Sequence, residues 1–391
     1  MISFNPRTMC KTLLASIGLL AAIAIPASAQ EPTEFDRYAA YDETSTTRID
    51  YAAFTEILRG SVFDVGRSDR IPGRGQDVIR TGTRISYENR SRYRYEANRL
   101  ALHLFEAEHR EVVAQYRAEL ESLPSRVNLA RLSSNEQLAY WLNLHNIVVI
   151  DELARAYPIR RLRNWKIDGV PYADAEIINL DGHRISLNDI RFNIVGANWD
   201  DPRVIYGFFS GAIGGPTLQS RAFESSRVWS SLEANAREYV NALRGVESER
   251  LGFRVSPLYE EWRDIMFPAW PEDLRSHLGQ FAEPNAQATI AVAEAPNFLI
   301  YDWAIADMTN GTPRCRGQNP AATQSNPCTT PPPHVAQLVN TIIERRLEFM
   351  RQGRLGSVTI TDVDTPDPDE DDGRSSRRIS PEGEAQGNEE S

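Results

Sequence analysis

Three side chains of the types used in nucleophilic catalysis stand far apart in the chain: His145, Ser210 and Asp302. A serine hydroxyl can act as a nucleophile when a histidine takes its proton, and a carboxylate can orient that histidine. Because His145 is a lone histidine in an apolar segment, the alternative is a buried imidazole with a structural role. A hydrolase or transferase therefore requires a fold that brings the three side chains within hydrogen-bonding reach.

A glycine-rich segment, Ser210–Pro216, follows an apolar run. Gly211, Gly214 and Gly215 would let backbone N–H groups approach an anion or an oxyanion closely. The spacing matches neither a phosphate-binding loop, nor a dinucleotide fingerprint, nor the sharp turn around a nucleophilic serine. The alternative is a tight turn that needs glycine only for its backbone conformation.

The segment Asn135–Ala156 is apolar at nearly every position, which predicts a helix buried on all sides. Asn143, His145 and Asn146 lie within it, and a buried polar side chain must find hydrogen-bond partners. Two interpretations follow. The three side chains form either a network that pins a neighbouring loop or one wall of a cleft in which His145 carries a proton.

Tyr301, Asp302 and Trp303 follow another apolar run. Asp302 is placed to orient a histidine or to accept a structural hydrogen bond from an indole N–H. Arg203 stands two residues after Asp201, so it either pairs locally or faces the same cleft.

The patterns typical of metal and cofactor sites are missing from the sequence. It has no His-Glu-x-x-His run, no paired-cysteine motif and no acidic loop with calcium spacing. We therefore expect no metal and no cofactor. The residues that we predict to bind a ligand are Asn143, Asn146, Arg203, Gly211, Gly214, Gly215, Tyr301 and Trp303.

The elements that must position these residues are mainly helical. Helical periodicity predicts helices over Tyr93–Leu123, from Ser133 or Ser134 to about Ala156, over Trp229–Leu243 and over His334–Gln352, with strands over Arg203–Phe209 and Ser357–Thr361. Strands are few and no alternation of strands and helices appears. We predict an α+β fold: one mainly helical domain over residues 30–361 with a small, mostly antiparallel sheet.

Both ends of the chain differ in composition from this domain. Residues 1–29 combine two cations, a short apolar run and a small-residue cleavage site, which predicts a cleaved signal peptide and a periplasmic or secreted protein that does not span the membrane. Residues 362–391 hold eleven Asp/Glu against three Arg, which predicts a disordered acidic tail. Removal of residues 1–29 moves the formal net charge from −11 to about −13, which argues against nucleic acid as a partner.

Two cysteines remain after cleavage, Cys315 and Cys328. In an exporting compartment we predict that they form a disulfide, which would stabilise the chain by roughly 3 kcal/mol. The alternative, a pair of metal-binding thiols, lacks further ligands at suitable spacing.

Four stretches resemble the family catalogued as domain of unknown function 547: Ile49–Tyr51, Asn135–Asn146 with Tyr157-Pro158 after it, Asp201–Leu218, and Asn297–Trp303. The resemblance covers residues 49–303 and implies no settled activity. This chain departs from the pattern at three places. Gly215 stands where the family has Cys, Ile205 where it has His, and Arg191-Phe192 where it has a Glu-His pair.

Three hypotheses for function remain open. The first is binding of a small molecule or an envelope protein without turnover, because the nucleophile position of the resembling family is Gly215 here. The second is a cofactor-independent hydrolase or transferase that uses His145, Ser210 and Asp302. The third is a structural interaction protein whose acidic tail serves as a solvating or tethering arm.

Overall fold

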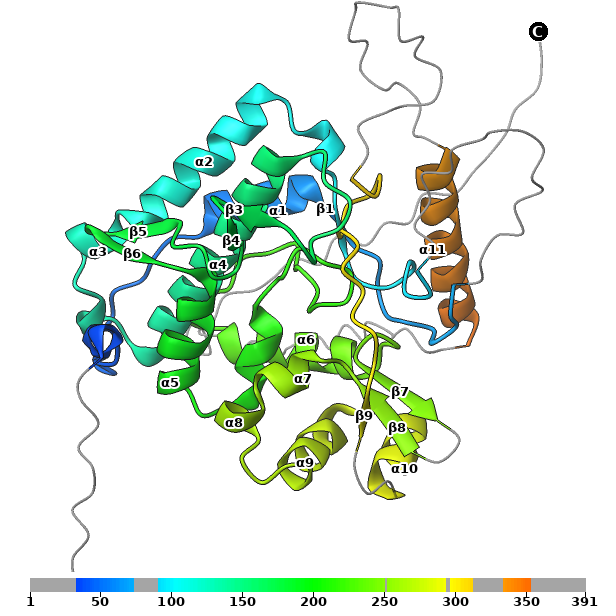
Figure 1. Ribbon diagram of the computed structural model, residues 1–391. Helices are drawn as coiled ribbons and strands as arrows, with labels where there is room; N and C mark the ends of the chain where they lie inside the picture. The colour runs from blue at the N-terminus through cyan, green and yellow to red at the C-terminus, as the bar shows by residue number, and fades with distance from the viewer. Residues whose placement is uncertain (1–32, 74–90, 250–251, 293–295, 312–332, 353–391) are drawn as a thin grey trace, which may run out of the picture. The chain divides into compact units, whose positions relative to one another are not determined.

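The computed structural model describes residues 33–73, 91–249, 252–292, 296–311 and 333–352 (Figure 1). Residues up to Glu344 form one compact unit, and the chain from Arg345 onward forms another, of which the described part is the end of a helix. The prediction of a mainly helical α+β fold is confirmed.

Helix α4 (Ser134–Ala156) lies at the centre of the hydrophobic core. The Ser133 hydroxyl accepts a hydrogen bond from the N–H of Glu136 at 3.4 Å, as expected for a helix N-cap. Every residue from Glu136 to Asp151 is buried, so the prediction of an all-round buried helix is confirmed. The helix ends before Pro158, which cannot continue it.

Helix α2 (Ala107–Glu121) packs along α4 (Figure 1). The prediction of one continuous helix over Tyr93–Leu123 is wrong at its start, since residues before Ala107 form a short strand, β2 (Arg99–Leu100), and turns. The apolar spacing that suggested a helix there comes partly from side chains that are exposed, such as Leu104 and Val112.

A 3-10 helix, η5 (Pro202–Gly207), precedes the glycine-rich segment. We predicted a strand over Arg203–Phe209 here. Asp201 caps it by accepting a hydrogen bond from the N–H of Arg203 at 2.9 Å, and Pro202 occupies its first position. The Asp201 cap and Pro202 favour the start of a helix, although the apolar run after them is typical of a strand. Helix α6 (Val228–Val240) then packs against η5, close to its predicted position.

The strands form four small sheets within the described residues rather than the single sheet that we predicted. They are antiparallel except for the β8–β9 pair. The pairs are β1 (Val62–Phe63) with β2, β3 (Lys166–Ile167) with β4 (Val170–Pro171), β5 (Ile178–Leu180) with β6 (His183–Ile185), and β7 (Val246–Glu249) with β8 (Gly252–Val255), which also pairs with β9 (Asn297–Phe298).

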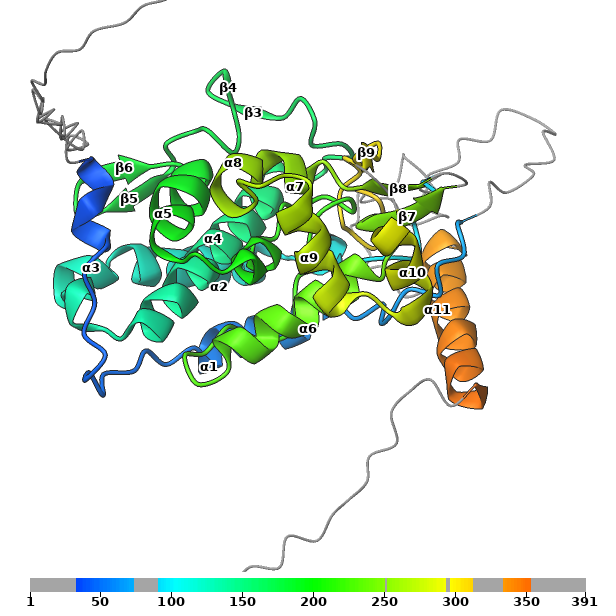
Figure 2. The ribbon, with the colours of Figure 1, turned by 90° about the horizontal axis from the view of Figure 1, so that it is seen from below.

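The remaining helices complete the described chain, with α10 beside the three-stranded sheet and α9 beside α6 (Figure 2). Their bounds are η1 (Glu34–Tyr38), α1 (Ala52–Ser61), η2 (Leu102–Leu104), α3 (Leu123–Arg126), η3 (Leu129–Arg131), η4 (Asp189–Val195), α5 (Gly196–Asn198), α7 (Leu258–Glu261), α8 (Arg263–Met266), α9 (Glu272–Phe281), α10 (Pro284–Val292) and α11 (Pro333–Arg351). The position of α11 agrees with the predicted helix over His334–Gln352.

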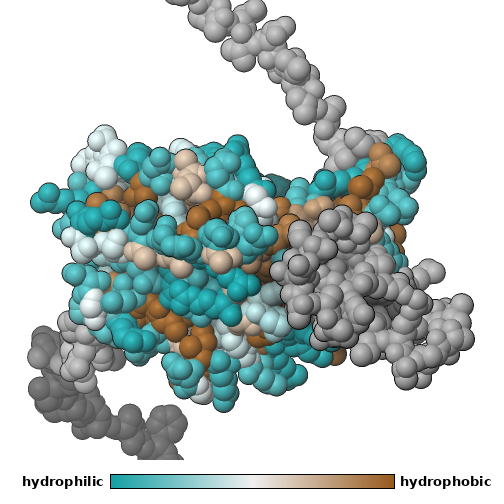
Figure 3. Space-filling view, turned by 90° about the horizontal axis from the view of Figure 1, so that it is seen from above, coloured by the Kyte–Doolittle hydropathy of each residue, from teal (hydrophilic) through white to brown (hydrophobic). Residues whose placement is uncertain are grey.

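On the face drawn in Figure 3, hydrophobic side chains gather in small groups between hydrophilic ones. Within the described part of the chain, no helix combines the length and apolarity that crossing a membrane requires. Four predictions lie outside the described residues: the signal peptide over 1–29, the disulfide between Cys315 and Cys328, the strand over Ser357–Thr361 and the acidic tail over 362–391.

Candidate functional site

Asn143 and Asn146 fasten two loops to helix α4. The Asn146 amide donates to the carbonyl of Gly207 at 3.0 Å and accepts from the N–H of Phe209 at 3.0 Å. Asn143 makes the same pair of bonds to the carbonyl and N–H of Phe223, at 2.8 and 2.9 Å. Both side chains are fully engaged with backbone, which is the arrangement expected of a network that pins neighbouring loops.

His145 lies between these two asparagines and is 3% exposed. Its Nδ1 is 3.1 Å from Oδ1 of Asn146, and its ring packs edge-on against Phe208 with centroids 4.9 Å apart. Burial, together with the positive charge of Arg191, lowers the pKa of the imidazole to about 3. His145 is therefore neutral at pH 7 and holds a proton poorly.

Ser210, Gly215 and Tyr301 converge on one point. The hydroxyl oxygens of Ser210 and Tyr301 are 2.9 Å apart. A Cβ atom at Gly215 would lie 2.3 Å from the Ser210 oxygen and 2.8 Å from the Tyr301 oxygen. The space that a side chain at position 215 would need is thus filled by two hydroxyl groups.

The glycine-rich loop uses its own backbone donors internally. Gly211 has a φ of +79°, and a Cβ at Gly214 would lie 2.7 Å from the backbone nitrogen of Asp302, so both positions require glycine. The N–H groups of Ala212–Gly215 donate, in order, to Ser210 Oγ (3.3 Å), Ala304 O (2.9 Å), Asp302 O (2.9 Å) and Ala212 O (3.2 Å). These four groups are not free to bind an anion, which favours the tight-turn interpretation of the motif.

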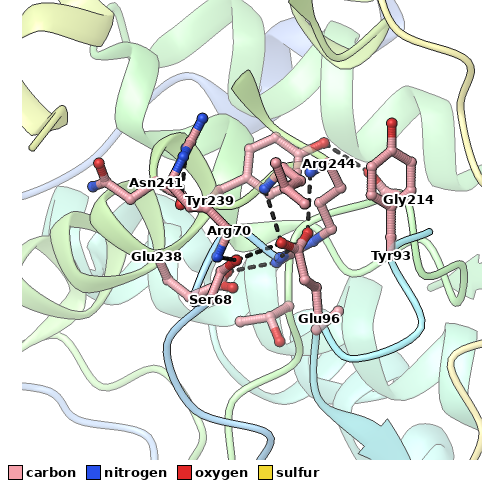
Figure 4. Close-up of polar contacts among 12 residues, drawn as sticks. Ser68, Arg70, Tyr93, Glu96, Gly214, Glu238, Tyr239, Asn241 and Arg244 are labelled. Carbon is pink, nitrogen blue, oxygen red and sulfur yellow. Dashed lines mark hydrogen bonds and ion pairs between the residues drawn. The ribbon is translucent and has the colours of Figure 1, made fainter. Parts of the chain in front are cut away.

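The carbonyl groups of the same loop are held from behind by α6 and the residues that follow it (Figure 4). The Tyr239 hydroxyl donates to the carbonyl of Gly214 at 2.7 Å, and Nε of Arg244 donates to the carbonyl of Gly215 at 3.2 Å. The Arg244 side chain is fully buried, and Glu96, which is 4% exposed, lies 3.8 Å from its Nη1.

Sequence reasoning missed this buried ion pair. Glu96 also accepts hydrogen bonds from the N–H groups of Leu243 and Arg244 at 2.9 and 3.1 Å, and Glu238 accepts from Arg244 at 2.6 Å. The available signal was an arginine inside the apolar run that follows α6. Its partner Glu96 lies far away in sequence, so the run alone does not identify the pair.

One of the two carboxylate oxygens of Asp302 is buried. Its Oδ1 accepts from the N–H of Ala304 at 3.1 Å, and its buried Oδ2 has no hydrogen-bond partner among the described residues. The buried guanidinium of Arg99 is close enough to feel its charge, although burial lowers the pKa of Arg99 to about 10. Trp303 packs on Tyr301 with ring centroids 4.6 Å apart. Asp302 thus makes no hydrogen bond with His145.

An ion pair stands near Tyr301 and His145. Arg191 in η4 donates to Glu261 at 2.6 Å, and its guanidinium lies over the rings of Phe192 and Trp262. Both charges act on the Tyr301 hydroxyl, whose pKa is raised above its ordinary value chiefly by burial. Tyr301 therefore stays protonated at neutral pH.

Arg203 lines a separate cavity of about 860 Å³ whose lining contains none of the loop residues Ser210–Pro216. It pairs with Asp201 at 2.6 Å and lies over the ring of Trp229, 4.9 Å from its centroid. The structure thus brings together Ser210, Gly215 and Tyr301 and places Arg203 elsewhere. Among the residues that the structure describes, no group of three or more His, Cys, Asp or Glu side chains could hold a metal ion.

Comparison with known proteins finds a resemblance to one family and no known activity. Residues 129–240 match the model of a family described as "Protein of unknown function, DUF547". The matched segment contains α4, the glycine-rich loop and α6, and it ends before Tyr301 and Asp302. No curated protein and no solved structure matches the chain.

Proposed function

We propose that this protein binds a ligand or partner without chemical turnover, at the surface around Ser210 and Tyr301. The observation that supports this most directly is the position of Gly215. Relatives in the resembling family carry a cysteine there, but here a Cβ would lie 2.3 Å from the Ser210 hydroxyl. The reactive side chain is absent, and its space is taken by a serine and a tyrosine.

The acid–base properties of the neighbouring groups support the same proposal. A general base is most effective when its pKa lies near the working pH, whereas the pKa of His145 is about 3. The raised pKa of Tyr301 makes it a hydrogen-bond donor rather than a base for Ser210. The hydrolase hypothesis needs His145, Ser210 and Asp302 to act on one another, and each has a different hydrogen-bond partner.

The surface around Ser210 and Tyr301 is suited to the recognition of a ligand or partner. Ser210, Tyr301 and Trp303 are partly exposed, and their backbone is fixed by the loop contacts described above. Aromatic rings with hydroxyl groups provide contact area together with directional hydrogen bonds. We also propose that binding takes place outside the cytoplasm, since the signal peptide prediction implies export. N-terminal sequencing of the exported protein would then begin at Gln30.

A ligand screen by thermal shift tests the proposal. Compounds that stabilise the wild-type protein are measured again on Tyr301→Phe, which removes the hydroxyl that contacts Ser210. We expect at least about tenfold weaker binding, since a hydrogen-bonding hydroxyl of the site is lost. Tyr41→Phe is the matched control, because Tyr41 is 54% exposed and lies outside the site.

Turnover is measured on the same compounds by mass spectrometry, together with labelling by a fluorophosphonate that reacts with activated serines. We expect unchanged compounds and no label on Ser210. Conversion of a bound compound, or a label on Ser210 that His145→Ala abolishes, would overturn the proposal in favour of the hydrolase. Ligands that bind Tyr301→Phe and wild type equally would show that the site lies elsewhere.

A further inference from the structure

The cavity of about 860 Å³ lies beside η5, α6 and α9, at a volume typical of small-molecule sites. Helices α6 and α9 contact each other and lie next to one another in Figure 2. The residues that enclose it come from four separate segments of the chain. None of the glycine-rich loop takes part, so the cavity is independent of the surface around Ser210.

Two tryptophans, Trp199 and Trp229, contribute to its lining. The indole N–H of Trp199 donates to Ser134 at 3.0 Å, and that of Trp229 donates to Asn135 at 2.8 Å. Both partners belong to the first turn of α4. Because the only polar atom of each indole is already used, the two tryptophans offer apolar ring surface to an occupant.

His277 provides an unused polar group. The side chain lines the cavity and is 5% exposed, and its Nε2 lies 2.8 Å from the Tyr206 hydroxyl. Its Nδ1 makes no hydrogen bond among the described residues. Burial lowers the pKa of His277 to about 4, so the ring is neutral at pH 7. In the tautomer whose Nε2–H donates to Tyr206, Nδ1 presents a lone pair to the cavity.

The charges around the cavity do not cancel. Arg203 pairs with Asp201, and Arg237 pairs with Glu233 at 2.7 Å. Two further carboxylates, Asp200 and Asp273, line the cavity and pair with no arginine of the described residues. With His277 neutral, the lining carries a net negative charge, which raises the concentration of cations at this solvent-open cavity.

From this combination we propose that the cavity binds a small organic cation: an ammonium or guanidinium group on a short apolar chain. The cation is balanced by Asp200 and Asp273, donates a hydrogen bond to Nδ1 of His277, and lays its chain against the rings of Trp199 and Trp229. Arg203, held between a carboxylate and the Trp229 ring, shows the same chemistry within the chain itself.

Isothermal titration of the purified full chain with four cationic probes and one anion tests the class of ligand. Cadaverine and agmatine represent free amines, and blocked Ala-Lys-Ala and Ala-Arg-Ala peptides represent basic side chains. Hexanoate is the anionic counterpart of similar length. We expect binding of at least one cationic probe, at least about tenfold tighter than hexanoate, and weaker with added salt. The free-amine and peptide arms distinguish the two sources of the cation.

The Asp200→Asn/Asp273→Asn variant tests whether the cations bind in the cavity. It keeps side-chain size and the bond that Asp273 accepts from the N–H of Ala269, and we expect at least about tenfold weaker cation binding. Asp264→Asn/Glu272→Gln is the matched control: it removes the same charge from exposed positions on α8 and α9 outside the lining.

His277→Gln and Trp229→Phe are measured in the same way, with circular dichroism to show that each variant is folded. We expect weaker cation binding in both. The proposal is overturned if no cationic probe binds at about 5 mM, a concentration that detects even weak sites. It is also overturned if hexanoate binds as tightly as the cations, or if the control variant weakens binding as much as the cavity variant.

Discussion

A buried neutral histidine lies at each of two regions, His145 near the glycine-rich loop and His277 at the cavity beside α9, but the contacts of the two rings differ. At the loop, His145 is packed on Phe208 and bonded to Asn146. At the cavity, His277 is bonded on one side only, and its other nitrogen has no hydrogen-bond partner in the described chain. The first region is fixed by its own contacts, whereas the second has space and unused polar groups.

This difference shows that a conspicuous sequence motif need not mark the place where a ligand enters. Gly211 adopts a left-handed backbone conformation, and Gly214 and Gly215 pass close to Asp302 and to two hydroxyl groups. The N–H groups of Ala212–Gly215 and the carbonyl groups of Gly214 and Gly215 make hydrogen bonds within the protein, which is the requirement for burying backbone. The cavity uses ordinary residues from several helices and leaves no compact pattern in the sequence.

The largest effect is expected for the ion pair behind the loop. Glu96→Gln removes the charge opposite the fully buried Arg244 and weakens the bonds to two N–H groups. Breaking a buried ion pair costs about 3 to 5 kcal/mol when the remaining charge is left unpaired, and because Glu238 still pairs with Arg244 we expect about 3 kcal/mol. Urea unfolding should show a loss of this size in the free energy of unfolding.

Glu233→Gln at the cavity rim is the control for Glu96→Gln, because its pair with Arg237 is largely exposed. A change of at most about 1 kcal/mol is expected there. Equal losses in the two variants would contradict the contrast between a fixed loop and an open cavity.

The two histidines predict a dependence of stability on pH. Between about pH 4 and the unfolded value near 6.5, His277 binds a proton in the unfolded state and not in the folded state. Stability contributed by its neutral form is therefore complete above pH 6.5 and is lost as the pH falls towards 4. The loss amounts to about 3 kcal/mol for this group.

Urea unfolding of wild type and His277→Gln at pH 7 and pH 4.5 isolates this contribution from that of the carboxylates. The gap between the two proteins should shrink by about 2 to 3 kcal/mol at the lower pH. A gap that stays constant with pH would mean that the pKa of His277 is the same in the folded and the unfolded protein, and would contradict the lowered pKa of the buried ring.

Prediction from sequence succeeded where the governing interactions are local. The N-cap at Ser133 and the unbroken apolar run of α4 determine that helix, and the polar residues within it were predicted to pin a loop or to line a cleft. Asp201 and Pro202 are also local signals, yet the apolar run after them suggested a strand rather than the capped 3-10 helix.

The site was harder to predict because its decisive partners are distant in sequence. The donors of the glycine-rich loop are satisfied by Asp302 and Ala304, some ninety residues later, and its carbonyls by Tyr239 and Arg244. Of the residues that we predicted from the sequence to bind a ligand, only Arg203 lines the cavity.

A smaller loss is expected for Gly215→Ala. The new methyl group would lie within 3 Å of two hydroxyl oxygens, and overpacking of this kind costs about 1 to 3 kcal/mol. Thermal and urea unfolding measure the loss. The double variant Ser210→Gly/Gly215→Ala removes the nearer obstacle and should recover most of the lost stability. Failure to recover it would show that the Tyr301 hydroxyl, which also lies within 3 Å, excludes alanine as strongly as the serine side chain does.

The smallest effect has the opposite sign and belongs to the cavity side. Gly279 lies in α9, and a Cβ there would meet no atom within 4 Å. Alanine reduces the freedom of the unfolded chain and favours the helix, so Gly279→Ala should raise the free energy of unfolding by about 0.5 to 1 kcal/mol. The same substitution thus destabilises at position 215 and stabilises at position 279, and urea unfolding of the two variants side by side measures both. A loss of stability for Gly279→Ala would mean that α9 is packed at this position as tightly as the loop is at Gly215.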